Sequence, residues 1–191
     1  MEQIDNKTNI LNNALKLFAA RGYEAVGIQE IVEASKITKP TLYYYFGSKQ
    51  GLLSVLLTHY FEQLYDRVKV AAEYRGDLPL NISNLFMTYF NFAKENPTFY
   101  RLQLSMRFAA PDSEPFKVVS ELNEKHYRLL EAMFKNAVKD HGNMQGRHKA
   151  YAATLLGMIN TYITLSLNNN IQLDDALLYQ AVHQFMYGIF S

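Results

Sequence analysis

The chain has 191 residues, of which 49% are hydrophobic and 19% charged, and its formal net charge is +1. This composition supports a large core and excludes a disordered chain, and the near-neutral charge excludes a global basic field that would attract nucleic acid or membrane. The sequence contains no cysteine, which excludes disulfides, cysteine-rich zinc sites and a thiol nucleophile.

Apolar residues recur with the 3.6-residue period of an α-helix along the chain, and no segment reads as a convincing strand. In the first part of the chain this pattern predicts three short helices, over residues 6–20, 28–34 and 38–46. Arg21-Gly22 ends the first helix, because glycine readily takes the left-handed conformation that follows many helices. We expect a domain boundary near Gly47, which gives a small domain over residues 1–47.

Six longer helices are predicted in the more aromatic remainder of the chain, residues 48–191. They run from Ser48 to near Arg75 and then over residues 80–94, 98–109, 113–140, 146–168 and 174–190. Asp174 and Asp175 suit the first turn of the last helix, where carboxylates interact favourably with the helix dipole. With nine helices and no strand, the predicted fold class is all-α.

The third predicted helix carries four adjacent aromatic residues, YYYF at residues 43–46. At about 100° per residue, Leu42 and Phe46 share one face of this helix and are expected to be buried. Thr38 suits the N-cap and Pro40 the first turn, where its missing N–H costs nothing. The exposed face then consists of Pro40, Thr41, Tyr43 and Tyr44, with Lys39 at its start.

This exposed face offers hydroxyls, a methyl group and flat rings but little charge, which suits a groove of DNA. A threonine can present its methyl to thymine and its hydroxyl to a base edge, and tyrosine hydroxyls can bond phosphates. Lys49 lies near the N-terminus of the next helix, and a lysine at a helix N-terminus makes a phosphate site. The alternative is that the tyrosines pack against the larger domain.

The first three predicted helices together form a helix-turn-helix module. Residues 28–34 and 38–46 are its two helices, and the second helix of such a pair lies in the major groove. The segment ALKLFAARGYEAVGIQEIVEASKITKPTLYYYFGSKQGLL closely resembles the N-terminal domain of the TetR family of bacterial transcriptional regulators. The resemblance covers about residues 6–57 without gaps, and TKPTLYYYFGSKQGLL is its most specific part.

The resemblance implies roles at matching positions. The implied DNA contacts of the second helix are Lys39, Pro40, Thr41, Tyr43 and Tyr44, with Thr38 as its cap and with Gln29 and Lys49 near phosphates. The sequence departs from the family pattern in two places. Val26-Gly27 replaces the usual Thr-Ser before the first of the two helices, which weakens the cap and removes a hydroxyl that often contacts phosphate. Lys36 replaces a frequent glycine in the turn, where a positive φ would carry strain.

Small side chains recur on the helix predicted over residues 146–168. They are Ala153, Gly157 and Thr161, and the last helix carries a second stripe of Leu178, Val182, Phe185 and Ile189. The family dimerises with its last two helices, so the resemblance implies a homodimer with a four-helix interface; the alternative is packing within one chain.

Residues 1–50 hold six Lys and Arg against five Asp and Glu, a net charge of +1, so affinity for DNA is expected to require two helix-turn-helix modules, one from each copy of a dimer.

Aromatic residues are concentrated between residues 86 and 108, and most of them are expected to pack in a core. The resemblance implies an inducer pocket in this domain, and aromatic and methionine side chains line adaptable apolar pockets. The candidate lining consists of Phe86, Phe90, Tyr100, Leu104, Phe108, Tyr127 and Met133. The expected effector is hydrophobic or amphipathic, with Tyr100 or Tyr127 offering an orienting hydroxyl, and the alternative is a solid core.

The sequence contains no G-x-S-x-G, P-loop or dinucleotide fingerprint, and its five histidines lack H-E-x-x-H spacing. We therefore expect neither an enzyme nor a bound metal or cofactor. The start, MEQIDNKTNI, lacks the apolar region of a secretory signal, and residues 155–167, the longest apolar stretch, are too short and too polar to span a bilayer. The expectation is a cytoplasmic protein without a membrane partner.

These observations favour a ligand-responsive transcriptional regulator, with a repressor as the preferred form. It would bind a palindromic operator in double-stranded DNA as a dimer and would be released by its effector. The alternative is a helical small-molecule-binding or interaction module whose DNA-binding part has decayed. Val26-Gly27 and the weak charge favour this alternative, whereas the intact segment TKPTLYYYF with Lys49 argues against it.

Overall fold

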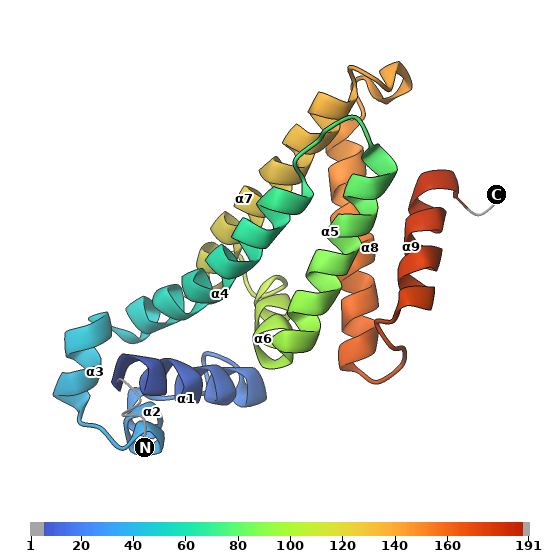
Figure 1. Ribbon diagram of the computed structural model, residues 1–191. Helices are drawn as coiled ribbons and strands as arrows, with labels where there is room; N and C mark the ends of the chain where they lie inside the picture. The colour runs from blue at the N-terminus through green and yellow to red at the C-terminus, as the bar shows by residue number, and fades with distance from the viewer. Residues whose placement is uncertain (1–5, 189–191) are drawn as a thin grey trace. The chain divides into compact units, whose positions relative to one another are not determined.

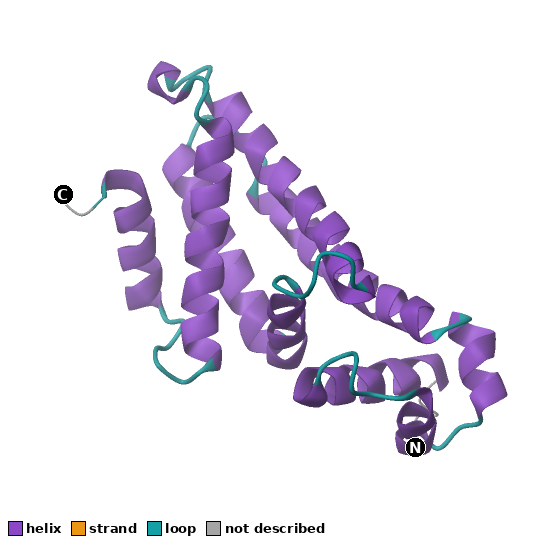
Figure 2. Ribbon diagram, turned by 180° about the vertical axis from the view of Figure 1, so that it is seen from behind, coloured by secondary structure: helices purple, strands orange, loops and turns teal. Residues whose placement is uncertain are grey.

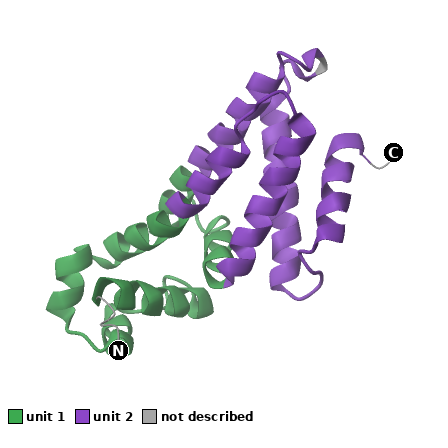
Figure 3. Cartoon of the chain, in the orientation of Figure 1, with its two compact units in different colours: residues 1–61, 98–122 green, residues 62–97, 123–191 purple. Residues whose placement is uncertain are grey.

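The computed structural model describes residues 6–188, except for the side chain of Asn143. This part of the chain forms nine α-helices and one short 3₁₀ helix and contains no strand (Figures 1 and 2). The all-α class predicted from the sequence is confirmed. The chain divides into two compact units, the first from residues 1–61 and 98–122 and the second from residues 62–97 and 123–191 (Figure 3). The functional division expected at residue 47 stays a prediction.

The first unit contains the N-terminal helices. They are α1 (Asn6–Arg21), α2 (Ile28–Ser35) and α3 (Lys39–Phe46), joined by the first half of α4 (Lys49–Ala71), by α6 (Pro97–Met106) and by the start of α7 (Glu114–Ala137). Helix α1 packs against α2, and α2 packs against α3. Ile10, Ile31 and Leu42, one from each of these three helices, are completely buried. Their apolar spacing therefore buries one face of each helix in a common core.

The second unit is built around three helices that lie side by side, α5 (Leu78–Glu95), α8 (His148–Leu167) and α9 (Asp175–Tyr187) (Figures 1 and 2). The rest of α4 contacts the rest of α7, since the Lys125 ammonium lies 2.6 Å from a Glu62 carboxylate oxygen. The 3₁₀ helix η1 (Gly142–Met144) precedes α8. The largest completely buried side chains of this unit include Phe86, Phe92 and Phe134, so most of the aromatic-rich region is core, as expected.

Several helix ends differ from the sequence-based boundaries. Helix α5 begins two residues earlier than predicted, because the Asp77 carboxylate accepts a hydrogen bond from the Leu80 N–H at 2.9 Å and caps the helix. Helix α6 ends at Met106, three residues before the predicted end, and α4 ends at Ala71. Helix α9 ends at Tyr187, and the predicted end at Phe190 lies outside the described residues.

Among the described residues, one helix, α8, is long and apolar enough to cross a membrane by length and composition. It is longer than the apolar stretch at residues 155–167, because the helix already begins at His148. Core helices of water-soluble proteins meet the same criterion, so this finding alone assigns no membrane role. Only 28% of its most apolar window is buried, so the described residues leave much of α8 uncovered.

Candidate DNA-binding surface

Helix α3 begins and ends where its sequence predicts. The Thr38 hydroxyl caps it by accepting a hydrogen bond from the Thr41 N–H at 3.4 Å, and Pro40 lies in the first turn. The helix stops at Gly47, whose φ of 71° requires glycine and whose N–H donates to the Tyr43 carbonyl at 2.8 Å. The predicted cap and the predicted place of the proline are confirmed.

The two faces of α3 divide as the helical wheel predicts. Leu42 and Phe46 are buried, whereas the Tyr44 side chain is 84% exposed and Tyr43 is 47% exposed. Lys39 and Pro40 are exposed, and Thr41 and Tyr45 are half-buried. The outward face therefore presents two phenols and a threonine on a helix that is anchored from behind, while its contact with DNA stays a prediction.

The start of α2 compensates for its missing hydroxyl. Gly27 is the N-cap and has no side chain to offer, but a Glu30 carboxylate oxygen accepts from the Gly27 N–H at 3.0 Å. That hydrogen bond, together with the ion pair to Arg21, lowers the pKa of Glu30. Glutamate at the third helical position is a known capping signal, and Glu30 provides it here. The prediction of a weakened cap did not take this signal into account.

The turn between α2 and α3 contains the strained lysine that the sequence suggested. Lys36 has φ 55° and ψ 44°, the left-handed conformation, which costs a residue with a Cβ about 1–2 kcal/mol. The turn is closed by the Lys36 N–H, which donates to the Glu33 carbonyl at 3.1 Å. Helix α1 supports the same turn, because the Asn9 amide donates to the Ser35 carbonyl at 2.7 Å.

Gln29 lies on the exposed side of α2. Its side-chain amide donates to the Glu33 carboxylate at 2.7 Å. A phosphate contact by Gln29 would have to share or replace this bond.

Helix α4 follows α3 so closely that Gly51 lies against the end of α3. The Ser48 hydroxyl caps α4 by accepting from the Gly51 N–H at 2.9 Å. A Cβ placed on Gly51 would lie 2.0 Å from the Phe46 carbonyl oxygen. Since real Cβ atoms do not approach an oxygen so closely, only glycine allows this packing of α3 against the first turn of α4.

The substitution Gly51→Ala should destabilise the first unit by about 1–3 kcal/mol, because the atom in conflict belongs to the backbone and cannot rotate away. Denaturant unfolding measures this difference. Gly142→Ala is the matched control, since a Cβ there meets nothing within 4 Å. Equal free energies of unfolding for Gly51→Ala and the wild type would show that the backbone between α3 and α4 can move to accept a Cβ at no cost in stability.

Lys49, the candidate phosphate contact, begins α4 and is held by an aromatic ring. Its ammonium lies 4.0 Å from the centroid of the Tyr23 ring. Tyr23 is buried, and its hydroxyl donates to a Glu114 carboxylate oxygen at 2.5 Å. Burial, followed by this hydrogen bond, raises the pKa of Tyr23 above its ordinary value, so the phenol remains a donor. No local pattern predicts a contact between residues 91 positions apart.

The seven candidate residues of the inducer pocket fall into both units. In the second unit, Phe86, Phe90 and Met133 are buried, and the Tyr127 hydroxyl donates to the Lys149 carbonyl at 3.0 Å. The rings of Phe86 and Phe90 contact each other edge to face, with centroids 5.7 Å apart. In the first unit the candidates are Tyr100, which is buried, Leu104, which is half-buried, and Phe108.

Phe108 differs from the expectation. Because α6 ends at Met106, Phe108 lies in the turn that follows and its side chain is 88% exposed. It does not line an enclosed pocket in this structure. For the other six candidates the pocket stays a prediction.

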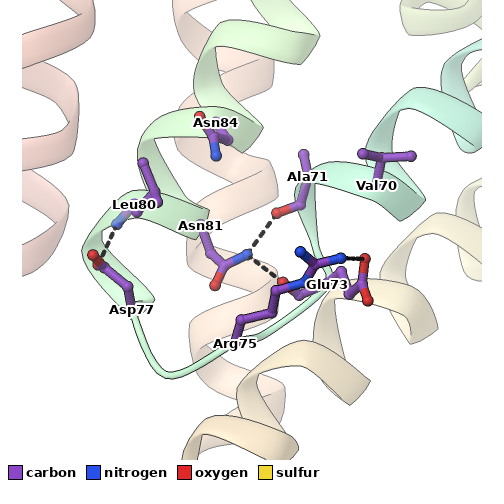
Figure 4. A pocket seen from close by; sticks show the side chains of 8 residues that line it. All are labelled: Val70, Ala71, Glu73, Arg75, Asp77, Leu80, Asn81 and Asn84. Atoms are coloured by element: carbon purple, nitrogen blue, oxygen red, sulfur yellow. Dashed lines mark hydrogen bonds and ion pairs between the residues drawn. The ribbon is translucent and has the colours of Figure 1, made fainter.

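Three hollows lie on the two units. One, of about 250 Å³, is at the turn between α4 and α5, where the Asn81 amide donates to the carbonyls of Ala71 and Glu73 (Figure 4). Another in the second unit, of about 670 Å³, includes Met133 in its lining. The third, of about 520 Å³, is in the first unit beside Tyr23 and Met106. Of the pocket candidates, Met133 alone borders one of these three hollows.

The small-residue stripe of α8 faces outward. Ala153, Gly157 and Thr161 are exposed, and a Cβ added to Gly157 would meet nothing within 4 Å. On α9 the corresponding side chains of Leu178, Val182 and Phe185 are half-buried, and Ile189 lies outside the described residues. The described residues therefore leave the α8 stripe open, and the dimer contact stays a prediction.

Residues 10–56, which contain the whole helix-turn-helix, match the family model described as "Bacterial regulatory proteins, tetR family". The transcriptional activator FasR of Mycolicibacterium smegmatis is 24% identical over 184 residues, which are 96% of this chain and 82% of FasR. The chain belongs to the TetR family. YuxN of Bacillus subtilis, a helix-turn-helix transcriptional regulator, is 40% identical over 70 residues, and this TetR-family chain spans only about a quarter of its length, 24%.

The TetR-family fold extends over the rest of the chain. The FadR regulator from Bacillus subtilis, whose crystal structure contains stearoyl-CoA, superimposes with a TM-score of 0.81 and covers 95% of this chain and 98% of its own, at 17% identity. At this identity the likeness concerns the fold. FasR is a helix-turn-helix transcriptional activator, and YuxN is an uncharacterized helix-turn-helix transcriptional regulator.

Proposed function

We propose that the protein is a ligand-responsive repressor that binds a palindromic operator as a homodimer and leaves it when an apolar or amphipathic effector binds. The observation that carries this proposal is the outward face of α3, where Tyr44 is 84% exposed on a helix fixed by the buried side chains of Leu42 and Phe46. Exposed apolar side chains that are grouped in one patch, as Tyr43 and Tyr44 are on α3, often mark an interaction surface.

The proposed contacts fall into two classes. Tyr43, Tyr44 and Thr41 read base edges in the major groove together with Lys39 and Pro40, because they share the outward face of α3. Thr38, Gln29 and Lys49 lie at helix starts, and we assign them to the phosphate backbone. Two such modules on one dimer would contact two half-sites about one helical turn of DNA apart.

Dimerisation is proposed through α8 and α9. The exposed stripe of Ala153, Gly157 and Thr161 lets a helix from a second copy approach closely, and half-buried Val182 and Phe185 lie on the neighbouring helix α9. Such a two-fold contact places the same residues on both sides of the interface. The protein would then act in the cytoplasm, where its operator is, and would have no catalytic role.

An amphipathic effector is supported by two observations. Phe86 and Phe90 are buried in the second unit with their rings in contact, and the FadR protein of the same fold is seen in complex with stearoyl-CoA. An effector shifts the protein away from DNA only if it binds the DNA-free conformation more tightly. A tenfold loss of operator affinity requires a difference of about 1.4 kcal/mol, within the usual range of allosteric coupling.

We expect an electrophoretic shift with the DNA upstream of the protein's own gene, and a loss of at least about tenfold in affinity with one member of an apolar and amphipathic compound set. The set should contain free fatty acids, acyl-CoA esters and sterols, with free CoA as the polar control. Binding unaffected by every compound would remove the effector from the proposal. Absence of any shift, with ligand binding retained in a thermal unfolding assay, would favour the decayed-module alternative.

A further inference from the structure

The ring of Tyr23 connects three separate segments of the first unit. It lies under the Lys49 ammonium at 4.0 Å, donates its hydroxyl to Glu114 at 2.5 Å and packs against Phe18 with ring centroids 5.2 Å apart. We propose that Tyr23 is a positioning residue: it holds the Lys49 ammonium ready for a DNA phosphate, and Glu114 holds Tyr23. This inference rests on the proposed function, because it needs Lys49 to contact phosphate.

The face of an aromatic ring attracts a cation, and this attraction strengthens where water is partly excluded. Tyr23 is only 6% exposed, and Lys49 above it is half-buried. An ammonium group has three N–H donors, so the ring can restrain one side of it while the other donors remain available to a phosphate oxygen. A lysine on a flexible stem loses rotamer freedom when it binds, and the ring removes part of that freedom beforehand.

The position of the ring is itself fixed from elsewhere in the unit. Tyr23 follows Gly22 in the loop after α1, and Glu114 is the first residue of α7. A buried hydroxyl needs a hydrogen-bond partner, and here the partner is the Glu114 carboxylate. The orientation of a DNA-contacting lysine therefore depends on the first turn of α7, through a side chain that is itself buried.

The salt dependence of DNA binding should distinguish the positioning role of Tyr23 from the charge of Lys49. Tyr23→Leu should weaken binding to operator and to unrelated DNA equally, by about two- to fivefold, because the phosphate contact is not sequence-specific. The slope of affinity against salt should stay unchanged, since the lysine charge remains. Lys49→Ala should also weaken both DNAs and should reduce that slope by about one phosphate contact. Tyr23→Leu combined with Lys49→Ala should bind like Lys49→Ala alone.

Two further variants serve as controls: one removes only the Tyr23 hydroxyl, and the other removes a different aromatic ring of the same unit. Tyr23→Phe keeps the ring and removes the bond to Glu114, so its loss of affinity should be smaller than that of Tyr23→Leu. Tyr60→Leu removes a half-buried ring of the same unit that stacks on Phe99, and the folded variant should bind DNA like the wild type. Free energies of unfolding, measured for every variant, identify conditions in which all are folded.

A readout without DNA tests the contact directly. The methylene protons next to the Lys49 ammonium should show an upfield ring-current shift in NMR spectra, retained in Tyr23→Phe and lost in Tyr23→Leu. Absence of this shift in the wild type would overturn the proposal. So would a combined variant that binds more weakly than Lys49→Ala by the full factor of Tyr23→Leu, because Tyr23 would then act through the fold. Failure of the wild type to bind any DNA would instead reject the proposed function.

Discussion

Replacing Gly157 by arginine should give a folded monomer whose affinity for operator DNA is lower by about 10²–10⁴-fold, the advantage that linkage of two binding modules confers. Gly157 is exposed in the middle of the α8 stripe, and a Cβ there meets no described atom within 4 Å. The arginine would therefore leave the monomer fold intact. Across a helix-helix contact, however, it would separate the helices and bury an unpaired charge.

Sedimentation equilibrium, together with operator binding, measures both parts of this prediction. Ala132→Arg, which places the same side chain on an exposed position of α7, should remain dimeric. Gly157→Ala is more discriminating, because alanine stabilises a helix interior by about 0.5–1 kcal/mol relative to glycine. If close approach matters, this variant should unfold at higher denaturant as a monomer and yet dimerise more weakly. A dimeric Gly157→Arg protein would place the interface elsewhere.

Alanine at Tyr44 or at Thr41 should each cost about 1–3 kcal/mol of operator binding while leaving the fold intact. Neither residue belongs to the core, since Tyr44 is 84% exposed and Thr41 is half-buried. The Thr41 hydroxyl lies 2.9 Å from the Thr38 hydroxyl. In Thr41→Ala the Thr38 oxygen can still accept from the backbone N–H of residue 41, so the helix cap is retained.

Operator and unrelated DNA should be titrated side by side, because a residue that reads bases changes the ratio of the two affinities. Leu42→Ala provides the contrast: Leu42 is completely buried, and its truncation should cost about 2–5 kcal/mol of stability. That variant should lose both kinds of binding as it unfolds. Tyr44→Ala and Thr41→Ala proteins with wild-type operator affinity would reject α3 as the reading helix.

The local features of α3 could be predicted from the sequence because each depends on residues within one or two helical turns. The Thr38 cap needs only Thr41, and the buried pair of Leu42 and Phe46 needs only the helical period. The left-handed conformation of Lys36 was implied by the resemblance, because Lys36 stands where the family often has a glycine. For such features, spacing along the chain already determines spacing in three dimensions.

Other features depend on where distant segments meet in the fold, and these were either not predicted from the sequence or predicted wrongly. Tyr23 and Glu114 are 91 positions apart, and neither residue is unusual in its own segment. Phe108 was placed on a helix expected to continue to Ala109, but α6 ends at Met106 without a proline or glycine to mark the end. Phe108 was therefore included among the seven candidate pocket residues, although it lies in an exposed turn.

The near-neutral charge of the N-terminal residues affects how the protein distributes between its proposed operator and the non-specific sites of the chromosome. Non-specific binding comes almost entirely from counterion release by basic residues, and residues 1–50 carry a net charge of only +1. For the proposed repressor, the million or more competing sites of a genome should therefore sequester few copies. A small cellular pool should then suffice to fill the operator, and the effector concentration, rather than the amount of DNA in the cell, should set the point at which the gene is switched.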